Sequence, residues 1–374
     1  MEPRMKIILI ASLTKDTTAS YLVDSLRSLG HTLLVCSDVY HSAADVICGE
    51  LADVFEISES ENFSPEAIFF IEGGSHRIIP VSLEKLSCLS LWYGIDTHMN
   101  YAKHLALGAL FDLTLIAQKQ YVNALKKDGL HNVDWLPLGF PHRLLPTLHR
   151  ERNIDVAYVG STNRDVNHER YKLLDTLRNH FDSVSFGRAN PPEMITIYSM
   201  AKIVFNKSIN NDLNMRFFEA MGSGAVLVTD PIMSNGLEDL FVEEKHYFSY
   251  KNSEELIGLV KKLLTDEERM LQVGVEAKEL ILSKHTYDHR AEAIIEYIEL
   301  SKKCDSAERK HHLEFYASLS MGLLGSSAII AAKGISEIPT RGLRSVVKQS
   351  LYLIISTAGF FIRFIESVAR RLRH

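Results

Sequence analysis

Three charged side chains, Lys207, Arg216 and Glu219, lie close together in the segment 204–230, VFNKSINNDLNMRFFEAMGSGAVLVTD. Its pattern predicts a strand, a short loop, an amphipathic helix, a glycine turn and a second strand. The first turn of a helix offers unpaired N–H groups and positive dipole to an anion. The two basic side chains add positive charge, and a carboxylate further along the helix accepts hydrogen bonds from hydroxyl groups. Together these groups suit a ligand with a diphosphate at one end and a ribose or hexose at the other.

The sequence leaves two interpretations of Arg216 open. In the predicted helix 212–221 it faces a bound anion, or it forms an i, i+4 ion pair with Asp212. Such a pair is worth only about 0.2–0.5 kcal/mol. Lys207 is placed more firmly, because it lies just past a predicted strand, at the edge where parallel α/β sheets bind their ligands.

Three other loops follow predicted strands in the same way. Gly160–Arg164 comes after the apolar run 154–159 and precedes a helix, which is the position of a phosphate-binding loop or of an ordinary capped turn. Gly73 and Gly74 follow the run 67–71, where they permit close approach of a ligand to the backbone or form a simple turn. Asp96 and His98 follow the strand 87–93. A histidine there bonds a sugar hydroxyl, moves a proton, or has a structural role.

Composition narrows the class of protein. The chain has 374 residues, 46% of them hydrophobic and 24% charged, as in folded globular proteins. A net charge of −6 gives no reason to expect a nucleic-acid partner. The four cysteines contain no CxxC pair, which indicates free thiols in a reducing cytoplasm rather than a zinc site or disulfides. The apolar run 7–13 is too short for a secretion signal and predicts a first buried strand.

Two series of alternating strands and helices run along the chain. The first ends near the proline-rich stretch 137–150, and the second begins with a strand at 154–159. Alternation of this kind predicts parallel, doubly wound α/β sheets, one in each half. The strands expected in the first half are 6–12, 31–37, 67–71, 87–93, 110–117 and 134–136. Those expected in the second half are 154–159, 183–186, 203–205, 225–230 and 247–250.

With both halves laid out, the chain resembles the GT-B glycosyltransferases of group 1, and most of all their spore-maturation (CgeB-like) branch. Four segments carry the resemblance, and a weaker fifth is HTYDHR at 285–290. They are LWYGIDTHMN (91–100), WLPLGF (135–140), DVAYVGSTNR (155–164) and NMRFFEAMGSGAVLVTD (214–230). The resemblance implies a Rossmann-like domain at 1–147 on the acceptor side, a second at 148–303 that binds the donor, and a helical tail at 304–374.

The resemblance implies a metal-independent enzyme that moves a sugar from a nucleotide-sugar donor to an unknown acceptor, in polysaccharide, spore-coat or glycolipid assembly. The catalytic residues would be Asp96 and His98, and Gly73 and Gly74 would line the acceptor side or the cleft. The donor would be bound by Gly160, Ser161, Arg164, Lys207, Arg216 and Glu219. No D-x-D triplet occurs, so we expect no metal on the diphosphate and no cofactor. Asn211 stands where many retaining members have a first glutamate, which keeps a non-catalytic scaffold open as an alternative. A sugar-nucleotide epimerase, which can share this fold, is the other alternative.

The tail from residue 304 lies outside the resemblance. It contains two apolar stretches, 316–332 and 351–362, and arginines surround the second. Apolar helices flanked by arginine suit an anchor on an anionic lipid surface, which predicts peripheral membrane contact through 313–374 at the inner face of the cell membrane. Packing of these helices on the second domain, or in a dimer, is the alternative.

Overall fold

The structure is a computed structural model, and it describes residues 4–49, 51–72, 78–147 and 151–301. Gly73, Gly74 and the tail 304–374 therefore lie outside the described residues. The chain divides into two compact units, Met1–Met99 with Asp112–Lys303, and Asn100–Phe111 with Cys304–His374. Both large sheets belong to the first unit, and the domain boundaries expected at 147/148 and 303/304 stay predictions.

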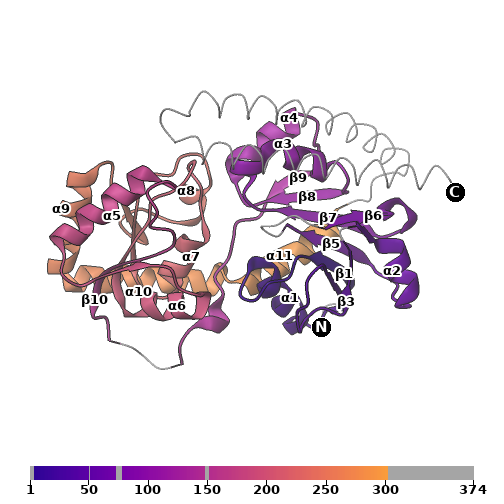
Figure 1. The fold of residues 1–374 in the computed structure, drawn as a ribbon, viewed down its shortest axis with the longest axis horizontal. Helices are drawn as coiled ribbons and strands as arrows, with labels where there is room; N and C mark the ends of the chain where they lie inside the picture. Colours follow the sequence, from indigo (N-terminus) through magenta and orange to yellow (C-terminus); the bar gives the residue numbers. More distant parts are fainter. Residues whose placement is uncertain (1–3, 50, 73–77, 148–150, 302–374) are drawn as a thin grey trace. The chain divides into compact units, whose positions relative to one another are not determined.

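The first sheet is parallel and has seven strands (Figure 1). Its order is β3-β2-β1-β5-β7-β8-β9, so the strand order reverses beside β1. The bounds are β1 Lys6–Ala11, β2 Thr32–Ser37, β3 Val46–Ile47, β5 Ala67–Ile71, β7 Leu89–Gly94, β8 Leu113–Ile116 and β9 Val133–Trp135. Runs such as AIFFI in β5 are buried at every position, because helices and loops cover both faces of a parallel sheet.

The second sheet, also parallel, has five strands in the order β11-β10-β12-β13-β14. Its bounds are β10 Ile154–Val159, β11 Val184–Gly187, β12 Ala201–Phe205, β13 Val226–Thr229 and β14 Tyr247–Ser249. The order reverses between β10 and β12, and open α/β sheets bind ligands at such a point, beyond the carboxyl ends of the strands. A separate pair, β4 (Leu51–Asp53) with β6 (Ile79–Val81), completes the strands of the described residues.

Helices cover both faces of the second sheet. Successive residues of β10 point to opposite faces, so Val156 belongs to one hydrophobic cluster and Ala157 to another. The helices α5 (His168–His180) and α9 (Ser253–Thr265) pack on the face of Val156. The other face is covered by α6 (Pro191–Met200), α7 (Met215–Gly222) and α10 (Glu267–Lys284). This is the doubly wound arrangement that the sequence predicts.

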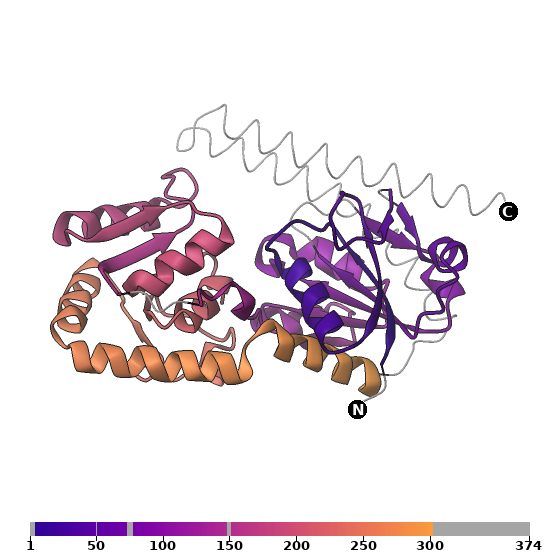
Figure 2. The ribbon, with the colours of Figure 1, turned by 90° about the horizontal axis from the view of Figure 1, so that it is seen from below.

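The last helices connect the two sheets. Figure 2 shows α10 followed directly by α11 (Tyr287–Leu300), which packs against α1 (Thr18–Ser28) of the first sheet. The chain therefore passes between the sheets twice, and the two passages are hydrogen-bonded to each other. Phe140 N donates to His285 O at 2.8 Å, and Tyr287 N donates to Phe140 O at 3.2 Å.

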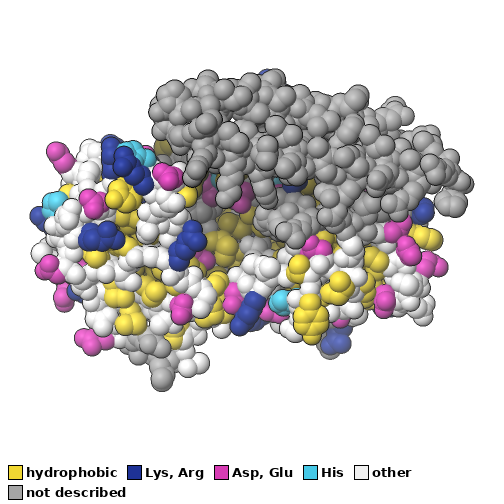
Figure 3. All heavy atoms as spheres, in the orientation of Figure 1, with side chains coloured by type: hydrophobic (Ala, Val, Ile, Leu, Met, Phe, Trp, Pro, Cys, Tyr) yellow, Lys and Arg dark blue, Asp and Glu magenta, His cyan; other side chains and the backbone are white. Residues whose placement is uncertain are grey.

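The remaining described helices are short or lie at sheet edges. They are α2 (Val54–Ser60), α3 (Thr97–Gly108), α4 (Val122–Lys127) and α8 (Leu237–Leu240), with single 3-10 turns at Leu83–Lys85, Lys119–Tyr121 and His142–Leu144. Among the helices of the described residues, none is both long and apolar enough to cross a membrane. On the face drawn in Figure 3, the coloured Lys and Arg side chains are interspersed with Asp and Glu.

Candidate functional site

One loop and the helix after it hold most of the predicted site residues. The chain leaves β12 at Phe205, and Asn206 anchors the loop by donating from its side-chain amide to Thr229 Oγ1 at 2.9 Å. The Tyr250 hydroxyl donates to the Asn206 carbonyl at 3.0 Å. Because these contacts tie the loop to the ends of β13 and β14, the residues that follow start from a fixed position.

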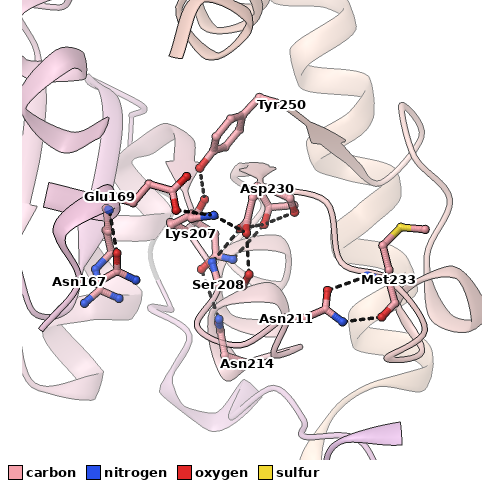
Figure 4. A network of polar contacts seen from close by, with 12 residues as sticks. Asn167, Glu169, Lys207, Ser208, Asn211, Asn214, Asp230, Met233 and Tyr250 are labelled. Carbon is pink, nitrogen blue, oxygen red and sulfur yellow. Dashed lines mark hydrogen bonds and ion pairs between the residues drawn. The ribbon is translucent and has the colours of Figure 1, made fainter. Parts of the chain in front are cut away.

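Lys207 lies at the centre of a polar network (Figure 4). Its Nζ is 3.1 Å from Asp230 Oδ2 and 3.2 Å from Glu169 Oε2. Asp230 also accepts hydrogen bonds from Ser208, one from the backbone N at 2.7 Å and one from the hydroxyl at 2.6 Å. Burial lowers the pKa of Lys207, but Asp230 and Glu169 outweigh it and raise the pKa overall, so the ammonium group stays charged.

A pocket of about 310 Å³ opens beside this network. That volume lies at the lower end of the range for small-molecule sites. It is lined by Asn167, Glu169, Lys207, the loop 208–211, Asp230 and Pro231. The lining combines a cation for an anionic group with carboxylates and amides that bond hydroxyls.

Arg216 is half-buried and bonded within its own domain. Its guanidinium donates to Val159 O at 2.8 Å, Asn206 Oδ1 at 2.7 Å and Tyr198 Oη at 3.3 Å. It also lies over the ring of Tyr158, 4.5 Å from the ring centre. Burial lowers the pKa of Arg216, but Tyr198 and Tyr158 raise it overall. The side chain therefore carries a fixed positive charge between the ends of β10 and β12, and its contact with a diphosphate stays a prediction.

The alternative ion pair between Arg216 and Asp212 is wrong. We expected the helix to begin at residue 212, but it begins at Met215, with Asn214 as the N-cap accepting from Arg216 N at 3.0 Å. Since Asp212 lies before the helix, it is not on the same helical face as Arg216. Asp212 instead accepts a hydrogen bond from Gln118 Nε2 at 3.1 Å.

Glu219 is 7% exposed on the same helix. Burial raises the pKa of its carboxyl from the usual 4.5 to about 7, although the charge of Arg216 opposes the increase. A carboxyl with this pKa changes its charge close to neutral pH. Burial is the main cause that raises the pKa values of Tyr198 and Tyr287, and the negative charge of Glu219 adds to both increases, which places those two phenols near it.

Asp96 and His98 come together with Asp212. All three offer a ligand atom within 4.8 Å of the others, and His98 Nδ1 is 3.9 Å from Asp212 Oδ1. Gln118 holds the arrangement, because its amide donates to Asp212 and its carbonyl accepts from Thr97 N at 3.0 Å. The pKa of Asp212 is raised, chiefly by burial; His98 and the Gln118 hydrogen bond lower it, and Asp96 adds to the increase.

The loop after β10 is brought only partly into this region. An added Cβ at Gly160 would lie 2.8 Å from Arg216 Nη2 and 2.7 Å from the Tyr158 hydroxyl, so the close approach requires glycine there. Ser161 follows directly, and its carbonyl accepts from Tyr158 Oη at 3.4 Å. Arg164 is exposed and donates to His168 Nδ1 at 3.1 Å. The donor-binding roles of these three residues stay predictions.

Sequence reasoning missed Glu169, Asp230, Gln118 and the position of Asp212. One signal was available for Asp230, because it directly follows β13, the strand that pairs with β12, and Lys207 follows β12. Carboxyl ends of adjacent parallel strands meet at one sheet edge. No comparable signal marks Gln118, whose partner Asp212 lies in the other half of the sequence.

Comparison with known proteins agrees with this architecture. Residues 142–296 match the family model described as "Glycosyl transferase-like". No curated protein sequence matches the chain. Among solved structures, sucrose-phosphate synthase from Thermosynechococcus elongatus is 13% identical, with a TM-score of 0.55, over 79% of this chain and 98% of that one.

Two further structures are similar. Anabaena Alr3699/HepE in complex with UDP is 13% identical, with a TM-score of 0.58, over 79% of this chain and all of that one. A glycosyltransferase from Rickettsia africae ESF-5 is 10% identical, with a TM-score of 0.57, over 79% and 98%. The predicted fold class, two Rossmann-like α/β domains of GT-B type, is confirmed.

Proposed function

We propose that the protein transfers a sugar, of hexose type, from a nucleotide-sugar donor to an acceptor hydroxyl. The pocket around Lys207 carries the proposal, since it lies at the carboxyl edge of the second sheet, within the part that matches the glycosyltransferase family model. The fold supports it further, because Alr3699/HepE with the same fold was solved with UDP and with UDP-glucose.

The diphosphate is assigned to Lys207 and the first turn of α7, so that its charge is met by an ammonium group and backbone amides without a metal ion. Glu169 holds the ammonium group with a side chain that is 69% exposed, whereas that of Asp230 is 10% exposed. A phosphate therefore displaces Glu169 while Asp230 keeps the lysine oriented. Arg216 adds a fixed charge behind this site, and Gly160, Ser161 and Arg164 complete the donor side.

The reaction needs negative charge to be stabilised on the leaving nucleoside diphosphate as the acceptor oxygen bonds to the anomeric carbon. Lys207 and Arg216 supply the positive charge for that step. Ionised Glu219 accepts hydrogen bonds from the donor ribose. Asp96 and His98 are assigned to catalysis, where the imidazole bonds the sugar hydroxyl or takes its proton.

One observation favours a second candidate, a GT-B scaffold that binds nucleotide without transfer. Asn211 replaces the expected glutamate, and its side chain is occupied: Oδ1 accepts from Met233 N at 2.8 Å, and Nδ2 donates to Gln120 Oε1 at 3.0 Å. An amide held in this way makes a loop-to-loop contact. Nucleotide binding without hydrolysis of any nucleotide sugar would favour the scaffold, and interconversion of free nucleotide sugars would indicate an epimerase.

The first test is the nucleotide affinity of wild type and Lys207→Ala, measured by thermal shift and calorimetry with UDP, GDP, dTDP and ADP. We expect one nucleotide to stabilise the wild type and Lys207→Ala to bind it roughly 10–100-fold more weakly, because hydrogen bonds to charged groups contribute about 1.5–3 kcal/mol.

Lys202→Ala is the matched control. Lys202 lies at the opposite end of β12 and is also paired with an aspartate, Asp155, at 2.7 Å. The Lys202→Ala substitution removes a comparable ion pair that lies away from the pocket, so the nucleotide affinity of this variant should equal that of the wild type. Equal affinity in Lys207→Ala and wild type would place the diphosphate elsewhere and refute the proposal.

We also propose the setting that the resemblance implies: a member of the spore-maturation branch, acting in polysaccharide, spore-coat or glycolipid assembly. The protein would work at the inner face of the cell membrane, with residues 313–374 as the membrane contact. The charge and apolar pattern of that segment supports this part of the proposal.

A further inference from the structure

Three side chains of metal-binding type converge from two distant parts of the sequence. Asp96 and His98 lie where β7 leads into α3, and Asp212 lies in the loop before α7. Their nearest ligand atoms, two carboxylate oxygens and an imidazole nitrogen, are all within 4.8 Å of one another. Ligands bound to one metal ion at about 2.0–2.2 Å each are at most about 4.4 Å apart, so a small inward movement of these side chains would bring all three atoms to one ion.

His98 supplies an independent observation. Its side chain is 4% exposed, and its Nδ1 is buried without a hydrogen-bond partner. Asp212 Oδ1 lies 3.9 Å from His98 Nδ1, which is too far for a hydrogen bond. Leaving a buried polar nitrogen unbonded costs about 1–3 kcal/mol, so such atoms call for an explanation. A ligand between the imidazole and the carboxylates supplies one.

Gln118 hydrogen-bonds to this group in the way that residues behind a metal site hydrogen-bond to the metal ligands. Its amide donates to Asp212, and its carbonyl is held by the backbone N of Thr97, the residue between Asp96 and His98. Gln118 therefore orients the buried carboxylate and the β7–α3 junction at once. Partners of this kind fix ligand orientation in metal sites. Asp96 is exposed, which gives an ion a route from solvent.

We propose that Asp96, His98 and Asp212 bind a divalent transition-metal ion. One imidazole nitrogen and two carboxylate oxygens suit Zn²⁺ or Mn²⁺, whereas Mg²⁺ prefers oxygen ligands alone. Water or a substrate hydroxyl completes the coordination. The ion offsets the negative charge of two aspartates, one of them buried.

This ion site is separate from the proposed diphosphate site, because Lys207, Asp230 and Glu169 take no part in it. Binding through Nδ1 leaves the proton on Nε2, so a metal-bound His98 donates a hydrogen bond to a hydroxyl and does not act as a base. The inference shares Asp96 and His98 with the proposed function, and of the two roles given there to His98 it keeps only the hydrogen bond to a hydroxyl. Its test is separate from that of the proposed function, since it measures an ion bound by the protein without nucleotide.

The test is calorimetric titration of the full-length chain, stripped with chelator, with Zn²⁺ and with Mn²⁺, alongside the metal-induced shift in melting temperature. We expect one tight site in the wild type. Asp212→Asn keeps an oxygen to accept from Gln118 but loses the charge, and His98→Ala loses the nitrogen. Gln118→Ala removes only an outer partner and should lower the metal affinity by roughly 10–100-fold. Asp212→Asn and His98→Ala each remove a ligand and should lower the metal affinity by more than that.

His180→Ala controls for adventitious binding, because the chain has 16 histidines and His180 is exposed on α5, where its Nδ1 bonds Thr176 O of the same helix. It should keep the tight site. Absence of a tight site in the wild type would overturn the inference. So would equal affinity in wild type, Asp212→Asn and His98→Ala. If the metal-free Asp212→Asn variant melts well below wild type, its weaker metal binding could reflect unfolding. The metal affinity of folded His98→Ala then decides whether the site exists.

Discussion

Glu219 should make the stability of this protein depend on pH in a specific way. Burial raises the pKa of its carboxyl from 4.5 to about 7, so the folded protein binds a proton that the unfolded chain has already released between those values. Below about pH 4 the group is protonated in both states and has no effect. As pH rises from there toward about 7, the free energy of unfolding decreases, because the unfolded chain releases this proton more readily than the folded protein. Above about pH 7 both states are ionised, and the loss of stability is constant.

The magnitude follows from the same two pKa values. Each pH unit between them is worth about 1.4 kcal/mol, so ionised Glu219 costs the folded state about 3 kcal/mol. Glu219→Gln keeps the shape of the side chain and removes its titration. The free energy of unfolding of the variant, relative to wild type, should therefore rise by about 3 kcal/mol between about pH 4 and pH 8.

Urea unfolding of both proteins across this pH range measures the difference, in which the titration of other groups cancels. Glu292→Gln, on the exposed side of α11, removes a surface carboxylate as the matched control and should leave the difference flat. A difference between wild type and Glu219→Gln that does not change with pH would refute the reasoning. It would mean that Arg216 fully compensates the buried charge.

Two further predictions concern packing and the tail. Gly222→Ala should destabilise the protein by about 1–3 kcal/mol in thermal unfolding, because the added Cβ would lie 2.6 Å from the fully buried ring of Phe140. Gly258→Ala is the control, because the position has open space in α9. It should be neutral or stabilising in the same assay. Deleting residues 305–374 should move the protein from the membrane to the soluble fraction of cells, and an unchanged distribution would contradict the membrane contact proposed for 313–374.

Local sequence patterns predicted every strand of the two sheets except the two-residue edge strand β3 (Val46–Ile47). Runs such as IILIA in β1 and AIFFI in β5 are apolar at successive positions, as expected for strands covered on both faces. Helix starts were less certain where several capping residues follow one another. In Asn210-Asn211-Asp212-Leu213-Asn214, every polar residue is able to cap a helix, and the structure uses Asn214. That choice places Asp212 outside the helix.

The sequence by itself determined that Lys207 follows a buried parallel strand and that Glu219 lies on the next helix, because both facts depend on neighbours along the chain. Only the tertiary structure decided the partners. Asp230 and Glu169 reach Lys207, and Asp212 reaches His98, through the packing of strands and loops that are distant in sequence. The burial that raises the pKa of Glu219 and leaves His98 Nδ1 unbonded also arises there. Residue types show which chemistry is available, but their distances and solvent exposure depend on how the whole chain folds.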